Sequence, residues 1–236
     1  MLDADFHSHT LFSGCGIHTV IEMLSAAREK GVKALAITDH GKLVGGKANN
    51  VFFERMDNPV NGIRLLKGIE ANLDGSGGTD TPQSVLKFMD IVLLGIHDNI
   101  PKNLGAEYYT KLLIDTIKKA PYVDLVSHPN NAGMFPLNHL DLCKAAIDYN
   151  FAIELNNSKI KYSRTDTADT MAMLEACVKT GCMTIIASDA HCITEIGEDR
   201  HIRTLLNSIS FPEHQIVNST YDKAIEFIDM RKKNKR

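Results

Sequence analysis

Two short motifs in this sequence place potential metal ligands two residues apart. His7 and His9 flank a serine, and Asp189 and His191 flank an alanine. Residues i and i+2 of an extended chain point to the same side, so each pair can present two ligands to one ion. Imidazole and carboxylate groups suit Zn, Mn and Fe. The pairs indicate metal chemistry, although a lone His-x-His pair is also common on surface strands.

Similar side chains follow apolar runs elsewhere in the chain. Taken singly, each is as well explained as a satisfied core histidine, a helix cap or an ion-pair partner. Their recurrence at the ends of nearly all the apolar runs favours a common site. These further groups are Asp39-His40, Glu70, His97, His128 and Asn156-Asn157.

The apolar runs are the expected strands that must position these groups. Most are continuously apolar, which is typical of parallel strands buried on both faces. We expect strands over residues 4–9, 34–39, 65–70, 91–97, 123–128, 152–156 and 184–189. We expect helices over residues 19–30, 107–119, 138–149, 167–180, 198–208 and 221–232. Thr19 and Glu22 form a capping box, and Gly181 is suited to end its helix.

Repeated strand–helix alternation predicts an α/β fold with a parallel sheet. A barrel and an open doubly wound sheet both fit this pattern. In a barrel, the carboxyl ends of all strands gather at one face, and the ligands would converge there. Residues 41–62 are long for a connection and are expected to be functional or to carry a short helix. Residues 72–82 are expected to be a flexible loop.

Composition narrows the function classes. The chain has 236 residues, 44% hydrophobic and 23% charged, which is ordinary for one globular domain, here expected over 1–236. The formal charge of −3 disfavours broad nucleic-acid binding. No apolar run approaches the ~20 residues of a membrane span. The acidic start lacks a secretory signal, and five cysteines without paired spacing fit a reducing compartment, so we expect a cytoplasmic protein.

Taken together, these motifs resemble those of the PHP (polymerase and histidinol phosphatase) superfamily, and most closely its stand-alone YcdX-like bacterial phosphatases. The resemblance runs in order from about residue 4 to about residue 220. It implies a distorted (β/α)7 TIM-like barrel that holds three divalent ions (Zn, Mn or Fe). The motifs that carry it are His7-Ser-His9-Thr10, Ile37-Thr-Asp-His40-Gly41, Gly68-Ile-Glu70-Ala-Asn72, Gly95-Ile-His97, Ser127-His128-Pro129, Glu154-x-Asn156-Asn157-Ser158 and Ser188-Asp189-Ala-His191.

The resemblance also implies which residues hold each ion. The first ion would take His7, His9, Glu70 and Asp189, and the second would take Glu70, His97 and His128. The third would take His40, His191 and one ligand from the loop after the first strand. YcdX-like members have a histidine at that loop position, where this chain has Cys15. Either Cys15 binds as a thiolate, or the loop shifts so that His18 reaches the ion, or the third site is weak or vacant. We slightly favour His18, because an exposed thiolate oxidises readily and both other ligands are imidazoles.

The resemblance implies a hydrolase of phosphoric esters, and we expect the substrate to be a small phosphomonoester. Metal ions lower the pKa of bound water, so a hydroxide near Glu70 and Asp189 could attack phosphorus, with His191 near the phosphate. Arg164 and Asn156 are the expected substrate contacts. Three divalent ions would change the formal charge from −3 to +3, which suits an anionic substrate.

Other functions remain open on the sequence alone. An oligonucleotide-end nuclease and a histidinol-phosphate phosphatase use similar ligands. A C–N hydrolase is chemically possible, but such barrels commonly carry a bridging carboxylated lysine where this chain has Glu70. A metal-bearing structural or regulatory domain is the non-enzymatic alternative.

Overall fold

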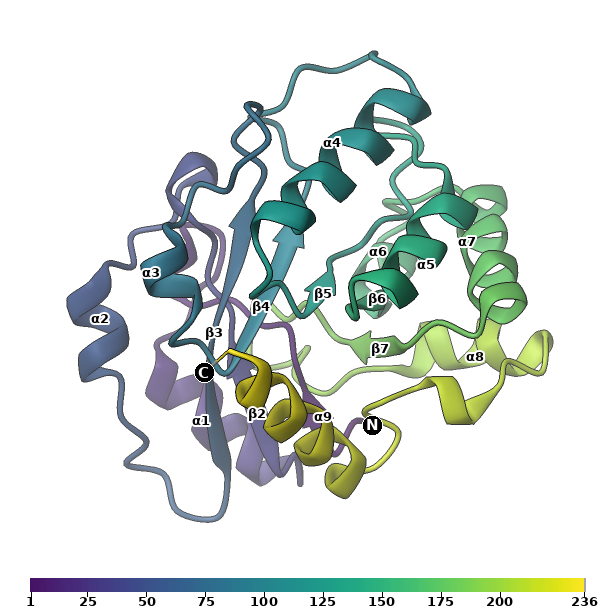
Figure 1. Ribbon diagram of the computed structural model, residues 1–236. Coiled ribbons are helices and arrows are strands. Elements are labelled where there is room, and N and C mark those ends of the chain that lie inside the picture. Colours follow the sequence, from purple (N-terminus) through teal and green to yellow (C-terminus); the bar gives the residue numbers. More distant parts are fainter. Residues whose placement is uncertain (236) are drawn as a thin grey trace.

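Seven parallel strands, arranged in sequence order, form the centre of the computed structural model, which describes residues 1–235 (Figure 1). Each strand pairs with the next in parallel, as expected from their continuous apolar runs. The strands are β1 (Ala4–Asp5), β2 (Ala34–Ile37), β3 (Arg64–Asn72), β4 (Ile91–Gly95), β5 (Leu125–Val126), β6 (Ala152–Asn156) and β7 (Thr184–Ala187).

A short bridge between the first and last strands makes the sheet a nearly closed barrel. Ser8 and Ala190 form an isolated parallel bridge just beyond β1 and β7. The His9 backbone N–H donates to the Ala190 carbonyl at 2.8 Å, and the Ala190 N–H donates to the His7 carbonyl at 3.2 Å. The structure therefore confirms the distorted (β/α)7 barrel and rules out the open doubly wound sheet.

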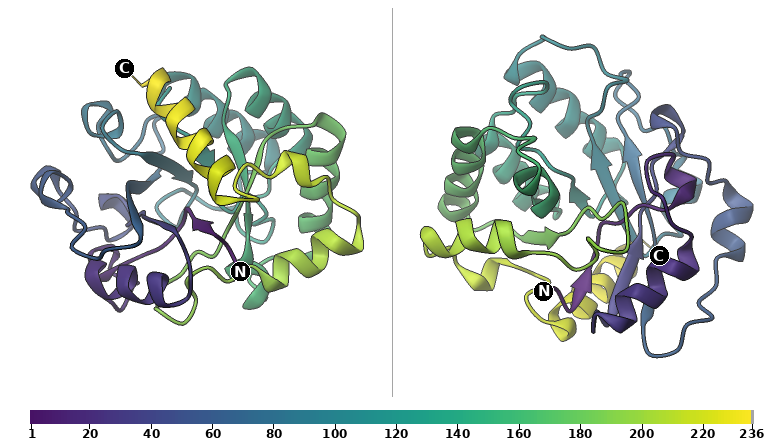
Figure 2. Two further views of the ribbon diagram at one scale, coloured as in Figure 1. Left: turned by 90° about the horizontal axis from the view of Figure 1, so that it is seen from below. Right: turned by 180° about the vertical axis from the view of Figure 1, so that it is seen from behind.

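The interior of the barrel is filled by side chains from all seven strands and is covered at one end by the last helix. Phe6, Leu66 and Leu93 belong to this inner cluster, together with Phe227 and Ile228 of α9 (Tyr221–Asn234). Seen from below, α9 crosses in front of the strands (Figure 2). Because the amino end of the barrel is closed in this way, the opposite, carboxyl end is left for the site.

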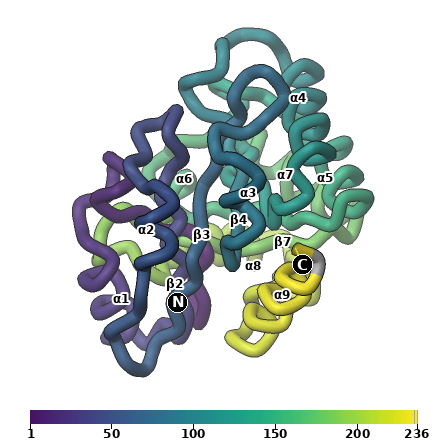
Figure 3. The backbone as a smooth tube through the Cα atoms, turned by 60° about the vertical axis from the view of Figure 1, so that its left-hand side comes forward, coloured from purple at the N-terminus to yellow at the C-terminus, as the bar shows by residue number. Residues whose placement is uncertain are grey.

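The other helices pack around the strands, with α1 and α2 on one side and α5 and α7 on the other (Figure 3). The predicted capping box of Thr19 and Glu22 begins α1, and Gly181 ends α7 with φ of 75°. The remaining predicted helices are present with shifts of a residue or two at their ends. The helices are α1 (Val20–Glu29), α2 (Asn50–Arg55), α3 (Gln83–Leu86), α4 (Ala106–Lys119), α5 (His139–Asp148), α6 (Asn157–Lys161), α7 (Thr167–Thr180) and α8 (Arg200–Ser208), with 3-10 turns at Leu11–Ser13, Lys42–Val44 and Glu213–Gln215.

The connection over residues 41–62 agrees with the sequence-based prediction, and the one over residues 72–82 does not. The 41–62 connection contains the Lys42–Val44 turn and α2, which confirms the prediction that it carries a short helix of its own. The 72–82 segment is not a loose loop, because Asp74 accepts hydrogen bonds from the N–H groups of Ser76 and Gly78 at 2.8 and 2.9 Å. The carboxylate of Asp80 accepts hydrogen bonds from the backbone N–H and the side-chain amide of Asn72, so the segment is a compact turn at the end of β3.

The basic end of the chain is more buried than its composition indicates. Arg231 is buried, and its Nε lies 2.7 Å from Oδ1 of buried Asp124. The ammonium of Lys235 lies 2.5 Å from the other oxygen of the same carboxylate. These ion pairs hold α9 against the barrel; the last residue, Arg236, lies outside the described residues. In the part of the chain that the structure describes, no helix is both long and apolar enough to span a bilayer.

Candidate metal centre

Glu70 lies at the centre of the site, at the carboxyl end of β3. The side chain is fully buried, and five imidazoles approach its carboxylate within 3.5 Å. His40 lies beside it in a parallel bridge that extends the β2–β3 pairing. Ser127 donates a hydrogen bond of 2.7 Å to Oε1. No lysine or arginine pairs with this buried anion among the described residues, an arrangement that is costly unless a cation joins it.

The first group of ligand atoms consists of His7, His9, Glu70 and Asp189, the set expected for the first ion. The two Nε2 atoms lie 3.0 Å apart, and each lies 3.2–3.5 Å from Glu70 Oε2 and Asp189 Oδ1. Two ligand atoms about 2.1 Å from one ion are ~3.4 Å apart at a tetrahedral angle. The spacing therefore fits one shared cation.

The second group surrounds the other oxygen of the same carboxylate. Glu70 Oε1 lies 2.8 Å from His128 Nε2 and 3.4 Å from His97 Nε2. Gly95 makes room for this ring, because a Cβ there would lie 2.3 Å from Cε1 of His97. With one oxygen toward each group, Glu70 has the geometry of the bridging ligand implied by the resemblance.

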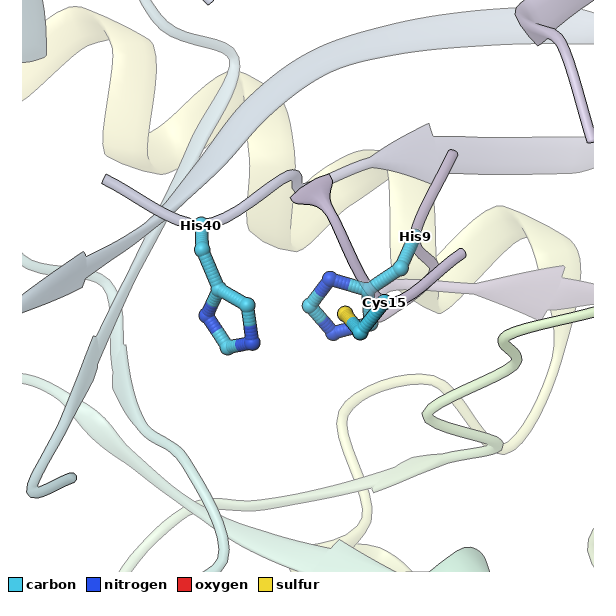
Figure 4. A group of neighbouring side chains, drawn as sticks. All are labelled: His9, Cys15 and His40. Atoms are coloured by element: carbon cyan, nitrogen blue, oxygen red, sulfur yellow. The ribbon is translucent and has the colours of Figure 1, made fainter. Parts of the chain in front are cut away.

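The third group lies beside the first, nearer the surface. Ligand atoms of His9, Cys15 and His40 all lie within 4.8 Å of one another, and Figure 4 shows the three side chains converging. The ring of His191 packs 4.5 Å from that of His9, centroid to centroid. Nδ1 of His191 bonds the Asp189 carbonyl at 2.9 Å, which leaves Nε2 available as a ligand.

The predicted loop residues are placed differently from one another. Cys15 is exposed but lies beside the imidazoles. Partial burial raises the pKa of its thiol, but the contacts with His191 and His40 outweigh burial and lower the pKa to about 6. His18 lies next to the N-cap of α1. The side chain of His18 is partly buried, and its Nδ1 has no hydrogen-bond partner among the described residues.

Ionisation in the cluster is strongly coupled. Burial opposes charge on His7, but the carboxylates of Glu154, Asp189 and Glu70 outweigh it and hold the pKa of His7 well above its usual value. Burial also opposes charge on Glu70, yet the surrounding imidazoles hold its pKa well below the usual range. Burial lowers the pKa of His9 to about 3, so this imidazole is neutral and ready to donate a lone pair.

Two residues that hold ligands in place were not predicted from the sequence. Glu154 on β6 accepts a hydrogen bond from Nδ1 of His7 at 2.6 Å, which directs Nε2 into the first group. Ser13 lies 2.7 Å from Nδ1 of His9 and accepts the backbone N–H of His40 at 2.8 Å. A buried Glu in an otherwise apolar strand, two residues before Asn156, was the available signal for Glu154.

The two predicted substrate contacts fall in different places. Asn156 is buried and fully engaged: its amide nitrogen donates to Glu154 and Asp189 at 3.1 and 3.2 Å, and its oxygen caps α6. These bonds tie Asn156 to Asp189, and its predicted contact with substrate stays a prediction. Arg164 is exposed beyond α6, with its guanidinium 5.5 Å from the ring centre of Tyr162.

Two proposed ligands adopt an uncommon backbone conformation. His128 and Asp189 have φ of 32° and 53°, in the left-handed region that side chains other than glycine seldom occupy. The backbone N–H of His128 donates to Glu154 at 2.5 Å. Backbone strain of this kind is concentrated at functional sites, where the surroundings fix the geometry.

The fold and the converging groups define a parallel α/β barrel with a ligand cluster suited to several metal ions at its carboxyl end. A family model described as "PHP domain" matches residues 5–233. The chain belongs to the PHP family.

Curated relatives match over nearly their whole length. A protein of Caldanaerobacter subterraneus subsp. tengcongensis named "Probable phosphatase" is 33% identical over 97% of this chain and 92% of its own. A protein of Proteus mirabilis with the same description is 32% identical over 97% and 94%.

Among solved structures, histidinol phosphate phosphatase of Lactococcus lactis has a TM-score of 0.65 and 15% identity, covering 89% of this chain and 94% of that one. At this identity the match shows the fold.

Proposed function

We propose that this protein is a metal-dependent phosphatase that hydrolyses a small phosphomonoester at a centre of three divalent ions. The observation that carries the proposal is the two-sided coordination geometry of Glu70, with one oxygen facing each of two imidazole groups. Relatives named as phosphatases over nearly the full chain support it. When bound, the ions supply a water of lowered pKa and offset the charge of the phosphate.

The proposed ligands follow the three groups of side chains. His7, His9, Glu70 and Asp189 hold the first ion; Glu70, His97 and His128 hold the second; His40 and His191 hold the third with a loop ligand. The buried, unpartnered atoms Glu70 Oε2 and His40 Nδ1 lie 3.0 Å apart without forming a hydrogen bond, as two ligands of neighbouring cations would. The donor set suits Zn, Mn or Fe.

The protein groups around the ions have distinct roles in the reaction. Glu70 and Asp189 would bind the ions next to which water attacks phosphorus. His191 would bind the ion next to the phosphate oxygens. Glu154 fixes the ring of His7, and Asn156 fixes the carboxylate of Asp189. Few protein cations are then needed to bind the substrate phosphate.

Lys159 is the protein cation best placed for that task. It lies in the first turn of α6 and is half-buried, and its backbone N–H donates to the Asn156 cap at 2.9 Å. Burial lowers the pKa of His128, and the Lys159 ammonium lowers it further; the same ammonium helps to lower the pKa of Asp189. No carboxylate pairs with it among the described residues. We assign it to a phosphate oxygen, with Arg164 farther out.

The test combines metal analysis with a substrate screen. Purified protein loaded with Zn or Mn is assayed on p-nitrophenyl phosphate, on natural small phosphomonoesters including histidinol phosphate, and on short RNA. We expect three ions per chain, turnover of at least one monoester, and loss of both activity and one or more ions in Asp189→Asn. A fully loaded protein that hydrolyses none of these would refute the proposal, and cleavage of RNA alone would replace it with a nuclease.

A further inference from the structure

The loop after β1 holds Cys15 in a defined position. Ser13 Oγ contacts both His9 Nδ1 and the His40 N–H, and Gly14 turns the chain with φ of 77° immediately before Cys15. Two residues later, the N–H of Ile17 donates to the carbonyl of His191 at 3.1 Å. The loop is thus tied to three imidazole-bearing segments, and the thiol lies beside the rings of His9 and His40 (Figure 4).

The polar atoms around this thiol are not satisfied by the protein. Glu70 Oε2 is completely buried and accepts no hydrogen bond from any described residue, and neither does the nearby buried atom His40 Nδ1 have a partner. Buried polar atoms are almost always paired, so an orphaned carboxylate oxygen facing an orphaned imidazole nitrogen indicates a missing cation. This observation is independent of the cysteine, and His40 belongs with Cys15 and His9 to one group of possible ligands.

His18 does not share this position. Its carbonyl accepts the N–H of Leu11, and it directly precedes Thr19, the N-cap of α1. The backbone bonds of Leu11 to His18 and of Ile17 to His191 fix the chain on this side of the loop, whereas the Cys15 thiol already lies in one group with His9 and His40. The sequence preference for His18 rested on the oxidation of an exposed thiolate, but a metal-bound sulfur is far less reactive than a free thiolate.

We infer that Cys15 is the loop ligand of the third ion and that its sulfur, with His40 and His191, makes this position selective for zinc or ferrous iron over manganese and magnesium. The inference rests on the proposed three-ion centre. Thiolates favour the softer ions, whereas Mn and Mg prefer oxygen ligands. The first two positions have only imidazole and carboxylate donors, so the third differs from them in kind.

Cobalt substitution tests the ligand directly. Metal-free protein is titrated with Co2+, and the thiolate-to-cobalt charge-transfer absorption in the near ultraviolet is followed. We expect the band in the native protein and its loss in Cys15→Ser. Cys192→Ser is the matched control, because Cys192 is the other partly exposed thiol near the centre and contacts Thr194 instead. His18→Ala controls for the alternative ligand; both controls should keep the band.

Metal competition tests the selectivity. Metal-free protein is equilibrated with Zn2+ and Mn2+ together, and bound ions are counted by elemental analysis. In Cys15→His the Zn-to-Mn ratio at one ion per chain should fall about tenfold or more, on the scale by which ligand surroundings change affinity. A band that persists in Cys15→Ser, a band lost only in His18→Ala, or an unchanged ratio would each overturn the inference. Turnover by the native protein, measured separately, shows whether the proposed function stands regardless.

Discussion

The carboxylate of Glu154 receives a 2.6 Å hydrogen bond from Nδ1 of His7, across 147 residues of sequence. Both side chains are completely buried. The contact sets the orientation of the imidazole, so that Nε2 faces His9, Glu70 and Asp189. Carboxylates that support ligand imidazoles in this way also raise their basicity. Glu154 is therefore a positioning residue, since it acts on the centre only through His7 and its neighbours.

Replacing Glu154 by Gln should weaken metal binding without abolishing the fold. The amide keeps the volume but loses the charge that supports His7, so we expect the affinity for the first ion to fall about 10–100-fold. Activity at limiting metal should fall in parallel and recover substantially in excess metal. The measurement is kcat as a function of free Zn2+ or Mn2+. Activity that is low and insensitive to metal would instead assign Glu154 a direct part in the reaction.

Much of the centre was predictable because strand geometry is local. The i, i+2 rule brings His7 with His9, and the parallel barrel brings distant strand ends to one face. The contacts around Glu70 follow the predicted grouping. The strands themselves are shorter than predicted at several carboxyl ends: β1 stops at Asp5 and β5 at Val126. Beyond these residues the backbone no longer pairs with the neighbouring strands in a regular way, and the ligand side chains point toward the centre.

The parts that were not predictable depend on contacts between distant segments. The position of Cys15 follows from Ser13 contacting both His9 and His40, which no local pattern encodes. His139 is buried and lies 2.7 Å from Asp169 because α5 packs against α7, a contact that no local pattern indicates. The contact of Asn156 likewise depends on Asp189, which lies just beyond the end of the neighbouring strand β7.

Lys159 and Lys161 form a matched pair for testing phosphate binding. Replacing Lys159 by Met should remove a charge-assisted contact of about 1.5–3 kcal/mol, so KM should rise roughly 10–100-fold and the inhibition constant of inorganic phosphate with it. Lys159→Arg should restore much of the loss. Lys161→Met is the control, because Lys161 already pairs with Glu198 at 2.8 Å. Equal effects of the two Met variants on KM would show that Lys159 does not bind the phosphate specifically.

The Cys15 thiol should ionise at unusually low pH in the metal-free protein. Its pKa is about 6, as described, compared with ~8.5 for an ordinary cysteine. In a Cys192→Ser background, with the other three cysteines buried, the rate of alkylation by iodoacetamide should rise through a midpoint near this value. Added Zn2+ should protect the thiol. A midpoint near the ordinary value would mean that His40 and His191 do not act on Cys15.

Removing the ions should destabilise the fold as well as stop the reaction. Buried Glu70 and Asp189 then lose their counterions, and folding loses the binding free energy of each ion, about 2.7 kcal/mol per site at 100 times Kd. For a chain of this size each kcal/mol corresponds to roughly 2–4 °C, so chelation should lower Tm by at least ~5 °C. Calorimetry with and without added metal measures the shift. Asp189→Asn should show a smaller shift, and an equal one would place the stabilising ions elsewhere.

The ion pair between Arg231 and Asp124 should matter for stability but not for catalysis. Arg231 donates from Nε to Asp124 and from Nη2 to the Val123 carbonyl at 2.7 Å, and it holds α9 over the amino end of the barrel. Arg231→Met leaves the buried Asp124 charge only partly compensated, so unfolding should become easier by about 3–5 kcal/mol. Lys233→Met, at an exposed position of the same helix, should change stability by less than about 0.5 kcal/mol. Denaturant unfolding gives both values, while kcat measured well below the transition should match the native protein. A loss of kcat there would show that α9 communicates with the metal centre at the opposite end.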